Sequence, residues 1–173
     1  MDVSGTTDNE GSERLAQYLS TQQVDASLVK PGQEMPTVPL AAAALGVLPG
    51  QIVKSILFEG KKDREMVVLA IAPGDVRVAA GKVGTAAGVS QLKLASPDTV
   101  LRATGYAVGG VPPVGHVTRL RVVVDSRVLQ HPFVFGGGGD EHHMLRITPQ
   151  DIVRLTGAVV ADVVADPEPR PAS

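Results

Sequence analysis

The chain has 173 residues, a length that fits one domain with a sizeable buried core. Its 43% hydrophobic and 20% charged residues are typical of globular proteins, and a formal net charge of −2 argues against a surface that binds nucleic acid throughout. The absence of cysteine excludes disulfides and a thiol nucleophile, and it fits the cytoplasmic location that we expect.

Both ends of the chain are polar. The opening residues are acidic rather than basic or apolar, so we expect neither a signal peptide nor a transit peptide. No apolar run approaches the length of about 18 residues that a membrane-spanning helix needs, so we expect no membrane partner. Residues 1–10 and the proline-rich residues 165–173 are predicted to be disordered, and residues 11–164 to form a single domain.

Capping residues, glycines and apolar runs predict the elements of the first part of the chain. In order, they are a helix capped by Ser12, a helix from Thr37 to Gly46, strands at 51–58 and 65–71 joined by a hairpin loop, a helix at 78–87, and a helix that starts at Ser96-Pro97 and ends at Gly105.

The second part of the chain continues this mixture. We expect a strand at 120–124, a turn at 125–127, strands at 133–135 and 144–147 around a glycine-rich loop, a helix from Thr148-Pro149 through Leu155 that Gly157 ends, and a strand at 158–164. Because strands and helices interleave irregularly around an early hairpin, the sequence predicts an α+β domain with a mixed sheet surrounded by helices. A doubly wound parallel fold fits less well.

Lys54 lies within an expected strand whose two faces are both largely apolar. Alternation along the strand places Lys54 on one face and Ser55 on the other. Burying an ammonium group there is costly. Lys54 is therefore either an edge residue that extends its amine into solvent or a functional residue at the rim of a pocket.

Glycines and prolines are concentrated between Thr104 and His116. Glycine allows a ligand to approach the main chain, and proline restricts the loop, so its free N–H groups could bind anions or hydroxyls. A plain connection between a helix and a strand explains the composition equally well.

The run of four glycines at 136–139 precedes Asp140, Glu141, His142 and His143. It lacks the Gly-Lys-Ser/Thr that ends a phosphate-binding loop. Adjacent histidines in an extended segment point to opposite sides, and His131 or His116 could complete a metal site only through unpredictable folding. We therefore interpret the run as a solvated hairpin loop and expect no metal and no cofactor.

The sequence offers no nucleophile with a recognisable base. It contains no Gly-x-Ser-x-Gly motif and no cysteine, and Ser55 is expected to face away from Lys54. A site built from main-chain groups and one lysine can position and polarise a substrate. This pattern favours attack by water or by a hydroxyl of the substrate.

Taken in order, several segments resemble the YbaK-like, prolyl-tRNA-synthetase-associated family of aminoacyl-tRNA deacylases. They are residues 44–47, 51–58, 74–75 with Arg77, 105–106 with 109–115, Asp125, 136–138 and 145–152. The similar region covers about residues 37–157, and the order and spacing of its pieces are more specific than any one of them.

The resemblance implies a mixed α/β domain with a curved, partly closed sheet that hydrolyses the ester of a mischarged tRNA. It implies that Lys54 is the catalytic residue and that the Gly-x-x-x-Pro loop at 109–113 receives the substrate. The implied substrate-binding residues are Gly109, Gly110, Val111, Pro113, Phe135 and Gly136. The implied partners are the 3′ end of an aminoacyl-tRNA and an aminoacyl-tRNA synthetase, with no DNA.

The region around 133–135 offers no clear equivalent of the histidine with which some members of the family choose alanine, and Phe135 stands where cysteine-specific members have a serine. The amino acid that is removed therefore stays open. The alternative function is a non-catalytic module that uses the same pocket to bind a nucleotide, a tRNA or a synthetase. A third reading is a metal hydrolase that uses His131, His142 and His143.

Overall fold

The computed structural model describes residues 10–32 and 37–167. The predicted disorder of residues 1–10 and 165–173 falls mostly outside these ranges. Within them, Glu10 belongs to the first helix, and the amide of Ala165 donates to the carbonyl of Arg77 at 2.7 Å. In the described part of the chain, no helix has the length and apolar character that crossing a membrane requires.

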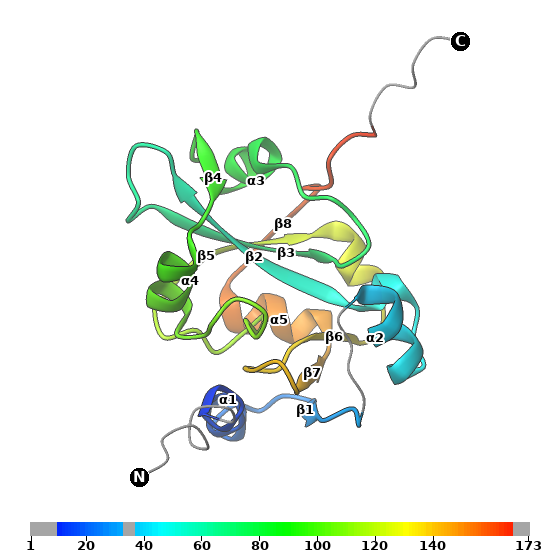
Figure 1. Cartoon of the computed structure of the whole chain (residues 1–173). Coiled ribbons are helices and arrows are strands. Elements are labelled where there is room, and N and C mark those ends of the chain that lie inside the picture. Colours follow the sequence, from blue (N-terminus) through cyan, green and yellow to red (C-terminus); the bar gives the residue numbers. More distant parts are fainter. Residues whose placement is uncertain (1–9, 33–36, 168–173) are drawn as a thin grey trace, which may run out of the picture.

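The strands form two sheets (Figure 1). The larger sheet has the order β4 (Leu92–Leu94), β2 (Val53–Gly60), β3 (Val67–Pro73), β5 (Arg121–Asp125) and β8 (Val159–Ala161). β2 is antiparallel to β3 and β4, whereas β5 is parallel to β3 and β8. The mixed sheet that the sequence predicts is therefore confirmed.

The smaller sheet is antiparallel and has the order β1 (Ala26–Val29), β7 (Met144–Ile147) and β6 (Val134–Gly137). An isolated parallel bridge between Ile52 and Phe135 joins the two sheets. The α+β class is confirmed, and the described strands do not close into a barrel.

The helices follow the local capping signals closely. They are α1 (Glu10–Ser20), α2 (Val38–Leu45), α3 (Ala80–Ala87), α4 (Pro97–Thr104) and α5 (Pro149–Thr156), with 3-10 turns η2 (Pro49–Gln51) and η3 (Ser126–Gln130). The side chains of Thr37, Ser96 and Thr148 accept the predicted capping hydrogen bonds. Gly46, Gly105 and Gly157 end their helices in the left-handed conformation, as expected.

Two sequence expectations were wrong at the amino-terminal end. The first helix starts at Glu10, so Ser12 lies inside it and is buried instead of capping it. Strand β1 was missed because it is short and carries no alternating pattern. Its existence depends on pairing with β7, more than 100 residues away in the chain.

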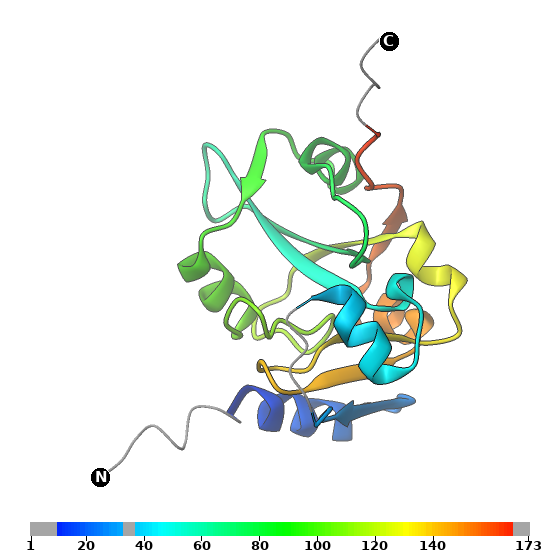
Figure 2. The same ribbon diagram turned by 45° about the vertical axis from the view of Figure 1, so that its right-hand side comes forward.

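Helices cover both faces of the larger sheet (Figures 1 and 2), and apolar side chains form a core on each face. Along β3, Leu69 and Ile71 point into one core, which α1, α4, α5 and the smaller sheet cover. Val68, Ala70 and Ala72 point into a second core beneath α3. This double burial explains why the sequence of β3 is almost continuously apolar.

Candidate functional site

A cavity of about 610 Å³ lies along the edge of β2. β3 pairs with β2 along Val53–Glu59, but β4 pairs with it only at Phe58–Gly60. The stretch Val53–Leu57 therefore has a neighbouring strand on one side and the cavity on the other. The cavity is lined by Val53, Lys54, Ser55, Ile56, Leu57, Leu94, Ala95, Pro97, Val100, Val108, Gly109, Val111, Gly137 and Met144.

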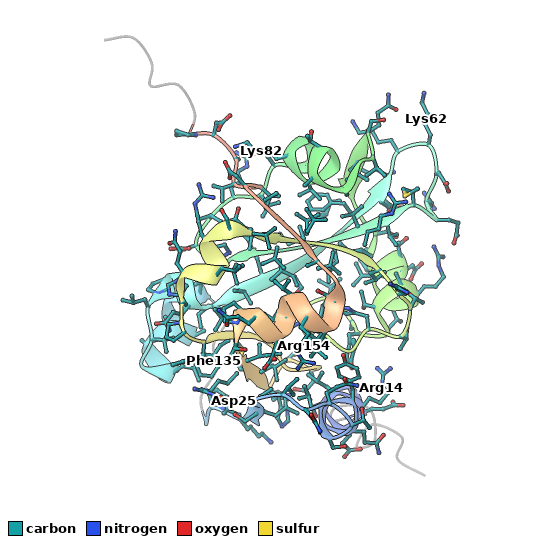
Figure 3. The ribbon with its side chains drawn as sticks, turned by 180° about the vertical axis from the view of Figure 1, so that it is seen from behind. Arg14, Asp25, Lys62, Lys82, Phe135 and Arg154 are labelled. Atoms are coloured by element: carbon teal, nitrogen blue, oxygen red, sulfur yellow. The ribbon has the colours of Figure 1, made fainter. Side chains whose placement is uncertain are left out.

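Three of the seven residues that the sequence analysis selected line this cavity: Lys54, Gly109 and Val111. The other four, Gly110, Pro113, Phe135 and Gly136, are buried beside it rather than in its lining. Phe135 (Figure 3) packs with Ala41, Ala42 and Ile52, and its ring meets the ring of Phe133 edge-on.

The amine of Lys54 donates a hydrogen bond to the main-chain carbonyl of Val76, in the loop after β3. Burial lowers the pKa of Lys54 below its ordinary value of 10.5, and the nearby carboxylate of Asp75 partly opposes this shift. His131 and Asp75 both lie beside Gly50. The Nε2 atom of His131 is 3.6 Å, and the Oδ2 atom of Asp75 is 4.0 Å, from the position that a Cβ on Gly50 would take. Lys54 itself is half-buried and lines the cavity.

The loop 109–113 is held by three hydrogen bonds. The amide of Gly110 donates to Ala107 at 3.0 Å, and the carbonyl of Gly110 accepts from the amide of Gly139 at 2.9 Å. The carbonyl of Pro112 lies 2.7 Å from Nε2 of His116, which must donate because a carbonyl only accepts. Burial lowers the pKa of His116, so its ring is kept neutral.

These contacts leave two main-chain donors of the loop without internal partners. Among the described residues, the N–H groups of Gly109 and Val111 have no hydrogen-bond acceptor. Both residues line the cavity, whereas the amide of Gly110, which was also expected to receive the substrate, is already engaged. Gly109 has a φ of +97°, which favours glycine at this point of the loop.

Ser55 also lines the cavity, although no sequence pattern marked it as a site residue. Its Oγ atom is buried and has no hydrogen-bond partner among the described residues. The alternation of the strand correctly placed Ser55 on the face opposite Lys54. Only the packed structure shows that residues of both faces line the cavity at the edge of the strand.

Residues 33–155 match the family described as the aminoacyl-tRNA editing domain. This match covers well over half of the chain. The chain belongs to the aminoacyl-tRNA editing domain family.

Individual relatives agree with this assignment. The proline–tRNA ligase of Thermotoga neapolitana is 30% identical over 149 residues, which are 82% of this chain and 25% of the ligase. The editing domain therefore spans about a quarter of the length of that enzyme. The uncharacterized protein YwhH of Bacillus subtilis (strain 168) is 32% identical over 131 residues, which are 75% of this chain and 82% of YwhH.

A solved structure has the same fold along almost its whole length. It was described as that of a proposed trans-editing enzyme for prolyl tRNA synthetase. It is 36% identical to the editing domain, superimposes with a TM-score of 0.81, and the similarity covers 91% of this chain and 98% of that one.

The glycine run of the editing domain was expected to be a solvated hairpin loop. The hairpin is confirmed, because β6 and β7 pair on either side of it. The solvation holds for Glu141 and His142, which are exposed, but was wrong for Gly138 and Gly139, which are buried. A Cβ on Gly139 would stand 2.6 Å from the carbonyl of Gly11, so the missing side chains allow α1 to approach the loop.

The histidines of the editing domain do not gather in one place. His143 lies 2.8 Å from Asp140, His142 is exposed, His131 lies beside Gly50, and His116 holds Pro112. Within residues 10–32 and 37–167, no group of three or more metal-binding side chains comes together. The three histidines of the metal-hydrolase reading are therefore dispersed.

Proposed function

We propose that this editing domain is a trans-editing deacylase, which hydrolyses the ester between a mischarged amino acid and the 3′ end of a tRNA. One observation carries the proposal: the two free amides of Gly109 and Val111 share a cavity lining with Lys54. The membership of the editing domain family and the description of the structural relative support it.

The cavity suits ester hydrolysis without a protein nucleophile. Among the described residues, its lining contains no histidine, aspartate or glutamate that could activate a serine. The attacking oxygen is therefore that of a water molecule, positioned by the substrate's own ribose hydroxyl. Water adds to the ester carbonyl, the bond from the carbonyl carbon to the ribose oxygen breaks, and the products are the free amino acid and a tRNA with a free terminal hydroxyl.

The loop 109–113 would stabilise the charge that develops in this reaction. As the carbonyl becomes tetrahedral, its oxygen becomes an anion, and unpaired N–H groups are the donors that bind such an anion best. Gly109 and Val111 supply two such groups. Their positions need no rearrangement during the reaction, because the bonds to Ala107, Gly139 and His116 already hold the loop.

Lys54 would exchange one oxygen partner for another when the substrate binds. Its amine is bonded to the carbonyl of Val76, and its flexible stem allows it to turn toward the cavity whose edge it lines. There an ammonium group would attract the ester carbonyl or the terminal phosphate.

A deacylase of this kind corrects errors that a synthetase makes when it selects its amino acid. A synthetase pocket distinguishes one methylene group by only about 1–3 kcal/mol, so a second site is needed to remove what is mischarged. A domain of net charge −2 has little general attraction for RNA, which favours a synthetase partner that holds the tRNA, in the cytoplasm.

The test is release of labelled amino acid from a panel that includes alanyl-, cysteinyl- and seryl-tRNA. We expect wild type to hydrolyse one or two of them and Lys54→Ala to lose at least about 100-fold in rate, the scale of one electrostatic group in an active site. Lys62→Ala is the matched control, because Lys62 projects into solvent from the β2–β3 loop (Figure 3). An intact panel, or equal rates for wild type and Lys54→Ala, would refute the proposal.

One observation favours a binding module as the second candidate: the Lys54 amine already has a partner in Val76. A module would bind a tRNA 3′ end or a synthetase without any turnover. Binding of a charged tRNA whose ester is hydrolysed no faster than it is without the protein would identify this function.

A further inference from the structure

Ser55 differs from every other side chain in the cavity lining. Apart from Lys54, the lining side chains are apolar or absent, as in glycine. The Lys54 amine has the carbonyl of Val76 as its partner, whereas the Ser55 hydroxyl has no partner among the described residues. Ser55 thus lines the cavity and carries a buried hydroxyl without a partner among the described residues.

A buried hydroxyl without a partner is costly, and it is rare in folded proteins. Replacing Ser55 with alanine would remove this cost with little change in volume. A hydroxyl at this position therefore needs a partner that enters the cavity from outside the chain. A substrate group can supply that partner when it fills the cavity.

The surroundings restrict the chemistry of that substrate group. The neighbours of Ser55 on its own face of β2 are Val53 and Leu57, both in the apolar core. A charged group would lose its hydration there, and the neutral hydroxyl of Ser55 offers no opposite charge to compensate. The α-ammonium of an aminoacyl ester would also be repelled by Lys54 on the same strand. A neutral group, such as a hydroxyl, fits.

We propose that Ser55 determines specificity by hydrogen-bonding to a neutral polar group on the side chain of the bound amino acid. This inference rests on the proposed function, because it takes the cavity to hold the aminoacyl end of the tRNA. A site that hydrogen-bonds a substrate hydroxyl discriminates strongly against the analogue that lacks it. Between seryl and alanyl groups, Ser55 therefore favours the seryl group.

Binding of two stable analogues separates this role from catalysis. In these probes, 3′-amino-3′-deoxyadenosine carries either a seryl or an alanyl group through an amide bond. We expect wild type to bind the seryl probe about tenfold more tightly, the effect of one hydrogen bond. Ser55→Ala is expected to lose this preference and bind the alanyl probe as wild type does, whereas Ser55→Thr retains the hydroxyl and the preference.

Ser27→Ala is the matched control, because Ser27 is an exposed strand serine. The preference of this variant should equal that of wild type. A wild-type protein that does not distinguish the probes, or a Ser55→Ala variant that still does, would overturn the role of Ser55. Failure of the proposed hydrolysis is seen separately, in the tRNA assay, because probe binding requires no turnover.

Discussion

The carbonyl of Gly110 accepts a hydrogen bond from the amide of Gly139 at 2.9 Å, which joins the loop that borders the cavity to the glycine run between β6 and β7. The glycine run is in turn in contact with α1, since a Cβ on Gly139 would meet the backbone of Gly11. Two segments that the sequence analysis treated separately therefore form one support for the candidate site.

The close approach of Gly137 to Val111 in the loop 109–113 predicts the effect of Gly137→Ala. The added Cβ would stand 2.2 Å from the carbonyl oxygen of Val111, a backbone atom that cannot move without the loop. We expect the loop to shift and tRNA hydrolysis to fall by at least about tenfold, because displaced donors no longer meet the oxyanion. Single-turnover rates measure the loss.

Gly81→Ala is the matched control for that substitution. Gly81 is exposed in α3, and a Cβ there would meet nothing within 4 Å. Alanine should stabilise the domain by about 0.5–1 kcal/mol in urea denaturation and leave hydrolysis unchanged. Equal activity of Gly137→Ala and wild type would show that the loop does not need its present position.

The charge of Lys54 predicts the pH dependence of hydrolysis. Burial lowers the pKa of Lys54, and a lysine is charged only below its pKa. After subtraction of spontaneous hydrolysis, we expect the enzymatic rate to decrease with rising pH at a point below 10.5, the ordinary lysine value. The carboxylate of Asp75 raises this pKa, so Asp75→Asn should move the decrease to lower pH. An identical profile for the two proteins would contradict an acting ammonium at Lys54.

Asp125 predicts a large loss of stability on substitution. It is fully buried, accepts from the amides of Arg127 and Val163 at 2.9 Å each, and pairs with the guanidinium of Arg127. Asp125→Ala leaves the buried Val163 amide without an acceptor, which should cost about 1–3 kcal/mol in urea denaturation. Glu141→Ala, at an exposed position, should change stability little, and equal losses would argue against this role of Asp125.

Asp140 predicts a loss of stability in acid. Burial alone would raise its pKa, but hydrogen bonds from His143, the amide of His142 and Ser12 outweigh burial and lower it below 3.8. A carboxyl group with a lowered pKa stabilises the fold above its unfolded pKa, and this stability is lost as the pH falls through the folded pKa. Urea denaturation at pH 7 and pH 3 should therefore show a smaller difference for Asp140→Asn than for wild type. Matching differences would show that Asp140 contributes nothing to acid sensitivity.

Local signals in the sequence were sufficient for most of the fold. The caps at Thr37, Ser96 and Thr148 and the terminating glycines act within a few residues, so their helices were predicted nearly to the residue. Two apolar runs on either side of a polar stretch likewise predicted the β2–β3 hairpin. Composition alone left Lys54 and the loop 109–113 open between a structural and a functional reading, and the family resemblance made them candidate site residues.

Tertiary structure alone decided the rest, because it depends on pairs that are far apart in the chain. Strand β1 exists through β7, and the division into two sheets depends on how Ile52 meets Phe135. Packing also decided that the Lys54 amine reaches Val76, that Ser55 faces a cavity, and that Gly138 and Gly139 are buried. The sequence names these residues and their intrinsic preferences, but the packed neighbours that orient each side chain come from distant segments and are specified only when the whole chain has folded.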